Sequence, residues 1–185
     1  MFVDQNLYSG RPEDKRSAVE EGCYELLDSL GLEYWRVDHE HAPSIEDCHE
    51  VEKVLGALIC KNLFLTNRQQ TEVYLLMMPG EKPFKTKLLS KQIGTTRLSF
   101  ATEEMMEKLL GVTPGSVSVL GLMNDKNLTV RLIIDEDLLK DEFIGCHPCM
   151  NSSTLKLKTQ DVIRKIVPAT KHSYTTVQLP WVIEE

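Results

Sequence analysis

Apolar positions along this chain follow two periods, one typical of helices and one typical of strands. The helical period predicts helices over residues 12–30, 45–55, 84–93 and 103–110, and a further helix that begins at Thr159. A glycine follows each of the first four segments, where it can adopt the left-handed conformation that ends a helix. Ser44 and Thr102 precede two of these segments and are suited to cap the first turn.

The strand-like period predicts strands over residues 34–37, 58–66, 73–78, 97–100, 116–122, 128–134 and 154–157. The second and third of these flank a polar stretch, residues 67–72, and predict a hairpin of buried strands. Alternation within residues 128–134 predicts that one face of that strand is buried. No internal repeat or linker interrupts the pattern, so we expect one α/β domain over residues 1–185, with a mixed or antiparallel sheet.

Composition supports a globular protein with one hydrophobic core, since 42% of the 185 residues are hydrophobic and 26% are charged. No apolar run is long enough to span a bilayer and the first residues do not form a secretory signal, so we expect a cytoplasmic protein. The formal charge of −7 argues against sequence-specific DNA binding, although a nucleic acid held at one end only is compatible with it. Cations nevertheless gather in one segment, at Lys82, Lys85, Lys87, Lys91 and Arg97.

The densest group of chemically useful residues is the stretch 145–154, Gly-Cys-His-Pro-Cys-Met-Asn-Ser-Ser-Thr. A polar loop of this kind that leads into a strand is typical of a functional site. His147 can be a general base or can hold the loop by a hydrogen bond, and both interpretations stay open.

Cys146 and Cys149 also suggest a metal or redox site. A structural zinc site needs about four ligands, and no second Cys/His pair follows at a suitable spacing. Five cysteines at irregular spacing do not form a disulfide framework either. We therefore favour incidental cysteines and expect no metal or cofactor.

Two other segments carry candidate chemistry. Lys61 is the single charge in the apolar run 58–65, so it faces either solvent or a pocket that contains an anion. The small-residue turn 111–118 lets backbone N–H groups approach a ligand, although it is not a Walker-type phosphate loop.

Three of these elements occur in a fixed order: Cys60-Lys61-Asn62-Leu-Phe-Leu, Gly111-Val-x-Pro-Gly115-Ser116-Val117, and Gly145-x-His147-Pro-x-x-Asn151-x-x-Thr154. Together they resemble the prolyl-tRNA editing superfamily of the YbaK/ProX type, and most closely its free-standing Ala-tRNA(Pro) deacylases. The resemblance covers roughly residues 20–170. It implies a partly barrel-like sheet with flanking helices, and an enzyme that hydrolyses the ester between a wrong amino acid and the terminal adenosine of tRNA.

The resemblance also implies roles for individual residues. The residues implied in catalysis are Lys61, Gly145 and His147. The residues implied in substrate binding are Asn62, Gly115, Ser116, Val117, Asn151 and Thr154. The candidates for contact with the tRNA acceptor end are Lys82, Lys85, Lys87 and Lys91.

Such an enzyme needs no obvious nucleophile, because an aminoacyl ester is already activated and positioned donors can stabilise the oxyanion. A narrow pocket would admit alanine and reject proline. Many relatives carry proline where this chain has Val119, so Cys-tRNA(Pro) or another small aminoacyl group stays open as a substrate. Two other functions stay open: a non-catalytic module that binds amino acid or charged tRNA, and a thiol or metal protein. The expected partners are mischarged tRNA(Pro) and prolyl-tRNA synthetase.

Overall fold

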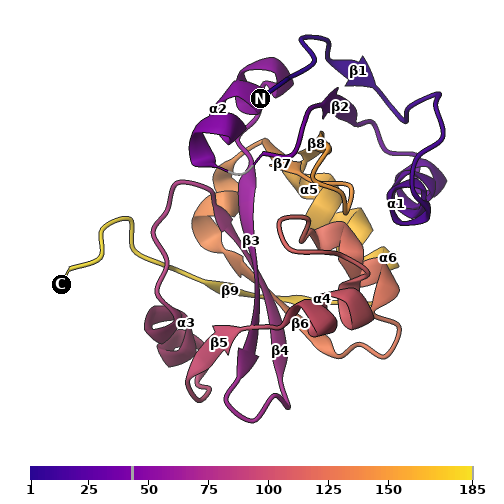
Figure 1. The fold of residues 1–185 in the computed structure, drawn as a ribbon. Helices are drawn as coiled ribbons and strands as arrows, with labels where there is room; N and C mark the ends of the chain where they lie inside the picture. Colours follow the sequence, from indigo (N-terminus) through magenta and orange to yellow (C-terminus); the bar gives the residue numbers. More distant parts are fainter. Residues whose placement is uncertain (43, 185) are drawn as a thin grey trace.

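The computed structural model describes residues 1–42 and 44–184, which form two β-sheets with helices packed around them (Figure 1). The strands are β1 (Tyr8–Ser9), β2 (Trp35–Asp38), β3 (Cys60–Asn67), β4 (Val73–Pro79), β5 (Leu98–Phe100), β6 (Val130–Asp135), β7 (Phe143–Cys146), β8 (Ser153–Lys158) and β9 (Tyr174–Val177). The helices are α1 (Ala18–Ser29), α2 (Ile45–Leu55), α3 (Thr86–Ile93), α4 (Glu103–Leu110), α5 (Thr159–Asp161) and α6 (Val167–Ala169). Two 3-10 helices, η1 (Val119–Asn124) and η2 (Glu136–Lys140), and a π-helical turn, η3 (Val162–Ile166), complete the chain. None of the helices in this described part is long and apolar enough to cross a membrane.

The first sheet is antiparallel with the strand order β1-β2-β8-β7, and the second has the order β5-β3-β4-β6-β9. In the second sheet β3 pairs antiparallel with β4 and β5, whereas β6 runs parallel to both β4 and β9. One parallel bridge between Ile59 and Gly145 links the two sheets. Because both sheets stay open in the described residues, the expected partly barrel-like sheet is corrected to two open sheets that meet at this bridge.

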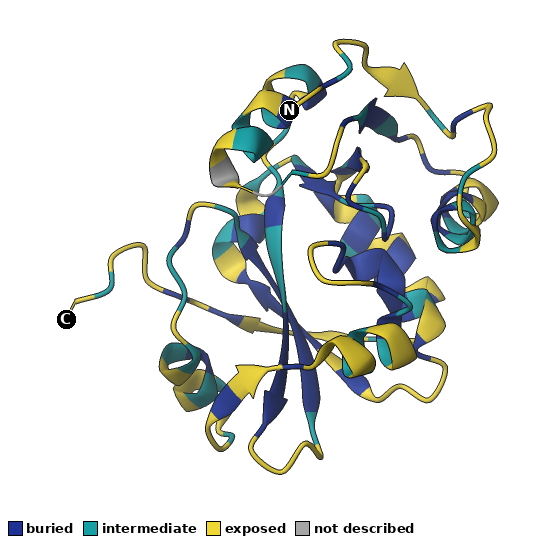
Figure 2. Cartoon of the chain, in the orientation of Figure 1, coloured by how far each residue is buried: buried dark blue, intermediate teal, exposed yellow. Residues whose placement is uncertain are grey.

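The central strands of the second sheet, β3, β4 and β6, bury side chains on both faces (Figure 2). On β3, Cys60 and Phe64 enter the main core, which also receives α1, η1 and β8, while Leu65 enters a second core beneath α3. The predicted buried face of residues 128–134 is confirmed, because Val130, Leu132 and Ile134 all enter the main core. The opposite face is also buried at Ile133, which enters the second core. A strand in the middle of a covered sheet buries successive side chains on opposite sides.

Local signals placed most helices correctly. The side chain of Ser44 accepts a hydrogen bond from the Asp47 amide at the start of α2, and Gly56 ends this helix with φ of 71°. The predicted helix over residues 12–30 is too long, since α1 begins after its cap Ser17.

The predicted strand over residues 116–122 is wrong. Ser118 Oγ accepts a hydrogen bond from the Leu120 amide and caps η1, in which Val119, Leu120 and Leu122 are buried. A short apolar run has no period that separates a strand from a buried helical turn.

Candidate functional site

Lys61 lies at the start of β3, beside a cavity between α2 and the turn that follows β4. Its side chain lies on the opposite face of the strand from Cys60 and is half-buried. The Nζ atom donates a hydrogen bond to the carbonyl oxygen of Lys82 at 2.6 Å. Burial lowers the pKa of the Lys61 ammonium. Because this cation is positioned but not paired with a carboxylate in the described structure, it can interact with a negative group in the cavity.

The cavity beside Lys61 measures about 150 Å³. Its lining residues are Cys48, His49, Glu52, Ile59, Cys60, Lys61, Gly80 and Glu81. His49 Nε2 and Glu81 Oε1 are 2.8 Å apart, which connects α2 to the turn across the cavity. The lining of this cavity therefore combines one cation and two carboxylates with apolar side chains.

Gly80 permits the close contact between the turn and β3. A Cβ atom added to Gly80 would lie 2.5 Å from the carbonyl oxygen of Ile59, which is too close for any other residue. The Ile59 amide in turn donates to Glu52 Oε1 of α2 at 2.9 Å. Ile59 is therefore fixed between α2 and the turn, and it forms part of the cavity wall.

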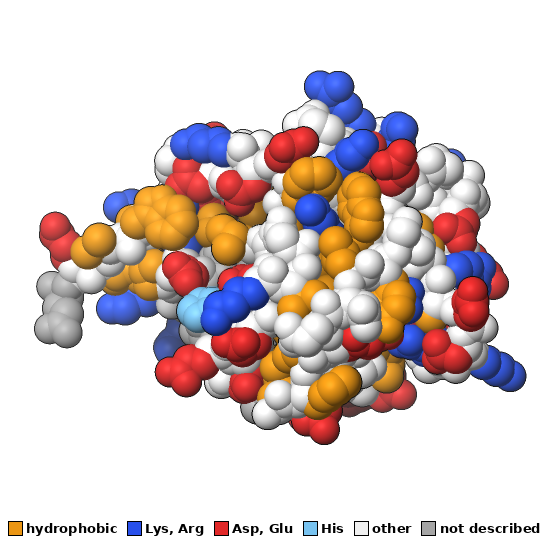
Figure 3. All heavy atoms as spheres, turned by 90° about the horizontal axis from the view of Figure 1, so that it is seen from above, with side chains coloured by type: hydrophobic (Ala, Val, Ile, Leu, Met, Phe, Trp, Pro, Cys, Tyr) orange, Lys and Arg blue, Asp and Glu red, His pale blue; other side chains and the backbone are white. Residues whose placement is uncertain are grey.

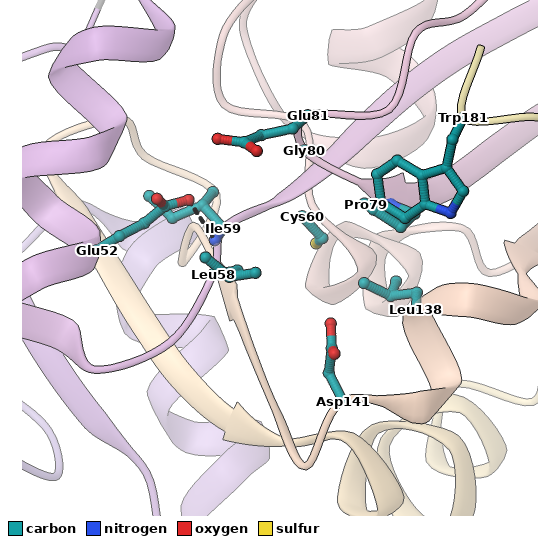
Figure 4. A pocket seen from close by; sticks show the side chains of 10 residues that line it. All are labelled: Glu52, Leu58, Ile59, Cys60, Pro79, Gly80, Glu81, Leu138, Asp141 and Trp181. Atoms are coloured by element: carbon teal, nitrogen blue, oxygen red, sulfur yellow. Dashed lines mark hydrogen bonds between the residues drawn. The ribbon is translucent and has the colours of Figure 1, made fainter.

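A second cavity of about 60 Å³ adjoins the first and shares five of its lining residues (Figure 4). It lies on the side of the C-terminal segment, so Trp181 forms part of its wall together with Leu138 and Asp141. Its complete lining is Glu52, Leu58, Ile59, Cys60, Pro79, Gly80, Glu81, Leu138, Asp141 and Trp181.

Gly145 lies directly behind the wall of these cavities. Its amide donates to the Leu58 carbonyl at 2.8 Å. An added Cβ would lie 3.0 Å from Leu55 Cδ2 and 3.2 Å from Ile59 Cα. The glycine thus lets β7 approach β3 and α2, and a side chain here would push on Ile59.

His147 belongs to a separate group of side chains around the segment that precedes α2. Its Nδ1–H donates to the Ser153 carbonyl at 2.9 Å, and Thr154 Oγ1 lies 3.4 Å from the same nitrogen. Thr154 also contacts His39 Nε2 at 2.8 Å, and the two imidazole rings lie 6.1 Å apart. Burial lowers the pKa of His147 to about 4 and also lowers the pKa of His39. Both rings are neutral at pH 7.

The turn at Gly115 meets the same group. Gly115 has φ of 85°, and an added Cβ would lie 3.3 Å from Asn151 Nδ2 and 3.4 Å from His41 Cε1. Ser116 and Val117, which follow in the chain, are buried. The motifs at residues 111–117 and 145–154 therefore meet around His39 and His41.

The predicted site residues thus form two neighbouring groups instead of one compact cleft. None of the contacts in the described part of the chain joins Lys61 directly to His147. Asn62 faces the opposite side of β3 from Lys61; its Nδ2 lies 3.3 Å from Cys60 Sγ, and its Oδ1 is buried without a hydrogen-bond partner among the described residues. Gly145 and the adjacent Ile59 lie at the junction of the two sheets.

Lys82 cannot be a tRNA contact, and this part of the prediction is wrong. Its side chain is 0% exposed, and Nζ donates to Asp135 Oδ2 and Asp137 Oδ2, each at 2.8 Å. The carboxylates that bury it come from β6 and η2, more than fifty positions away, so the local run of lysines gave no sign of them. The other three candidates, Lys85, Lys87 and Lys91, are exposed on or beside α3.

The cysteine stretch is turned inward. Cys146 and Cys149 are buried, as is Cys23 of α1. Burial raises the pKa of the Cys146 thiol, and a hydrogen bond with Cys149 raises the pKa of Cys23. Raised pKa values disfavour the thiolate, which is the reactive form of cysteine. Within the described residues, no three His, Cys, Asp or Glu side chains are grouped closely enough to hold a metal ion.

Several residues that surround the site lie outside the three sequence motifs. They are His39, His41, His49, Glu52 and Gly80, and three of the five histidines of the chain lie within residues 39–49. This clustering was a usable signal. The role of Gly80 had no such signal, because it depends on a contact with Ile59 across the sheet.

Comparison with known proteins identifies the family. The model of the aminoacyl-tRNA editing domain family matches residues 39–165, about two thirds of the chain. The chain belongs to this family. A protein from Acetoanaerobium sticklandii named prolyl-tRNA editing protein ProX is 32% identical over 153 residues, which cover 83% of this chain and 93% of that protein. The Danio rerio prolyl-tRNA synthetase associated domain-containing protein 1 is 28% identical over 88% of this chain and 86% of its own length.

A solved structure also shares the fold. A protein described as a candidate trans-editing enzyme for prolyl tRNA synthetase superposes with a TM-score of 0.67 at 16% identity, over 90% of this chain and all of that chain. The editing domain is therefore of the YbaK/ProX type, as the three sequence motifs had indicated.

Proposed function

We propose that this protein is a trans-acting aminoacyl-tRNA deacylase that hydrolyses mischarged tRNA(Pro), with Ala-tRNA(Pro) as its preferred substrate. The observation that carries the proposal is the cavity of about 150 Å³ beside Lys61, in a chain of the aminoacyl-tRNA editing domain family. The name of the Acetoanaerobium sticklandii relative supports a prolyl-tRNA substrate.

The reaction is the hydrolysis of an ester. Water adds to the carbonyl carbon, negative charge develops on the carbonyl oxygen, and the bond to the ribose oxygen breaks as that oxygen takes up a proton. The products are the free amino acid and uncharged tRNA. Such a step requires a positioned water and donors for the oxyanion more than a protein nucleophile.

Lys61 is suited to stabilise the developing negative charge. Its ammonium is half-buried at the cavity, and the Lys82 carbonyl fixes its position. An electrostatic interaction of this kind is stronger where water is partly excluded. Glu52 and Glu81 line the same cavity and can accept hydrogen bonds from the α-ammonium of the aminoacyl group.

The size of the cavity supports selection by volume. At about 150 Å³ the cavity is small beside the roughly 300–1,000 Å³ of ordinary ligand pockets, which suits a small aminoacyl group. We propose that Gly145 keeps Ile59 in place in the cavity wall. His147, which is neutral at pH 7, positions the loop that follows β7. The exposed residues Lys85, Lys87 and Lys91 are the proposed contacts with the acceptor end.

A deacylation panel tests the proposal. Purified protein, with no metal added, is incubated with tRNA(Pro) charged with Ala, Cys, Ser or Pro. We expect fastest hydrolysis of Ala-tRNA(Pro) and little of Pro-tRNA(Pro). Lys61→Met should lower kcat/KM by about 100-fold or more, the size seen when one oxyanion donor is removed.

Lys53→Met is the matched control, because Lys53 is an exposed lysine on α2, paired with Glu50. It should leave hydrolysis unchanged. Full activity of the Lys61→Met variant would reject its catalytic role. Binding of charged tRNA without hydrolysis of any ester would favour the non-catalytic module instead.

A further inference from the structure

Trp181 lies in the C-terminal segment, outside the residues matched by the family model, yet it forms part of the smaller cavity wall. After β9 the chain buries Leu179 in the second core and then carries Trp181 over Lys82. The indole Nε1–H donates to Asp137 Oδ2 at 3.0 Å, and Lys82 Nζ lies 4.9 Å from the ring centroid. These contacts fix the ring in one orientation.

The fixed ring is nevertheless open to solvent. Trp181 is 55% exposed, and Leu58 on the same cavity is 61% exposed. Apolar side chains lie at the surface near the C-terminal end of the chain (Figure 3). An ordered and exposed indole offers a flat apolar surface that loses little conformational entropy when a ligand stacks on it.

The charges nearby indicate which ligand fits. Glu52, Glu81 and Asp141 line the cavity, and Lys82 beneath the ring is already paired with two aspartates. Carboxylates repel phosphate, but they accept hydrogen bonds from an amino group. A neutral aromatic base with an exocyclic amine matches these surroundings.

The volume of the cavity decides where such a base would lie. At about 60 Å³ this cavity is well below the roughly 300–1,000 Å³ of ordinary ligand pockets, so it does not enclose a whole nucleotide base. The base would therefore lie on the exposed face of the indole, at the mouth of the cavity.

We propose that Trp181 binds the terminal adenine of the tRNA acceptor end by stacking. The inference rests on the proposed function for the identity of the ligand. It adds a binding residue outside the family motifs and assigns the two cavities different roles: the larger one receives the aminoacyl group, and the rim of the smaller one receives the base. Stacking on an aromatic side chain contributes enough that its loss lowers affinity by about 5- to 150-fold.

Tryptophan fluorescence can test this directly. Trp35 is the only other tryptophan, so a Trp35→Phe background isolates the signal of Trp181. The trinucleotide CCA should quench it, while the dinucleotide CC, which lacks the adenine, should quench it much less. Absence of quenching by CCA at millimolar concentration, or equal quenching by CC, would overturn the proposal.

Variants then measure the contribution of the ring through the affinity for uncharged tRNA. In the wild-type background, Trp181→Ala should weaken binding by about 5- to 150-fold, and Trp181→Phe should retain most of it. Val182→Ala is the matched control, because Val182 is 77% exposed and does not line the cavity. Thermal melts of each variant show whether it is folded; equal loss of affinity in folded Phe and Ala variants would contradict stacking.

The outcomes separate this inference from the proposed function. Normal deacylation together with unchanged binding by Trp181→Ala would reject the stacking role alone. Quenching by CCA that depends on Trp181, in a protein that hydrolyses no aminoacyl ester, would reject the deacylase and keep the binding residue.

Discussion

Replacing Lys82 by methionine should destabilise the protein severely. The variant keeps the length of the side chain but removes the cation from a site where Lys82 and Asp135 are both 0% exposed. Removing one member of a buried ion pair leaves the other charge without compensation, which costs about 3–5 kcal/mol. For a chain of this size each kcal/mol lowers the Tm by about 2–4 °C, so we expect a decrease of about 6–20 °C.

Urea unfolding and thermal melts followed by circular dichroism measure this effect. The double variant Lys82→Met/Asp135→Asn should recover part of the loss, because it also removes the buried carboxylate. Lys85→Met is the matched control: Lys85 is exposed three positions away, so its loss should leave stability within ~0.5 kcal/mol of wild type.

A second readout separates the two lysines by function. Lys85→Met should reduce the salt dependence of tRNA binding by about one unit of slope, as expected for one lost phosphate contact. Lys82→Met, assayed at a temperature where it is folded, should leave this slope unchanged. A Lys82→Met variant as stable as wild type would refute the reasoning that this lysine is a structural ion-pair partner.

Two further predictions concern the site. Gly80→Ala should lower deacylase activity and stability together, because the added Cβ would lie 2.5 Å from the Ile59 carbonyl oxygen. The control is Gly94→Ala, at the positive-φ end of α3 where no atom lies within 4 Å, and it should lower stability alone. Unchanged activity of Gly80→Ala would contradict the role proposed for Ile59 in the cavity wall. The pKa of His147 is about 4 in the folded protein, below its usual value of about 6.5. Between these two pH values the unfolded chain binds more protons than the folded protein. The free energy of unfolding therefore falls by up to about 3 kcal/mol as the pH drops from 6.5 to 4. Urea titrations at pH 7 and 4.5 should show this loss in wild type and a smaller loss in His147→Gln; equal losses would show that His147 is not the group responsible.

The sequence predicted those parts of the fold that depend on local chemistry. Ser44 and Gly56 mark the ends of α2 because caps act within one turn of the helix. The hairpin of β3 and β4 was equally visible, since two apolar runs flank a short polar turn.

Features that depend on distant partners were missed. The edge strand β9 is largely exposed and exists through its pairing with β6, about forty residues earlier. β7 was interpreted as part of a polar loop, although Gly145 and Cys146 pair with β8. A short strand whose stability comes from its neighbours has no period long enough to detect.

The candidate site shows the same division. The motifs identified the family and the residue types, but their spacing could not show that Lys61 and His147 lie in different groups, or that Trp181 completes a cavity wall. These placements result from the packing of two sheets and a C-terminal segment, so no local pattern encodes them.

The alternation of side chains on β3 also restricts how this protein can change. Insertion of one residue near the start of the strand would turn Lys61 toward the main core and Asn62 toward α2, because neighbouring positions point in opposite directions. Length variation can therefore be tolerated in the exposed turn at residues 68–71, but not in the strand itself. Among homologues with different substrates, we expect differences at this strand to be replacements of side chains, with its length conserved.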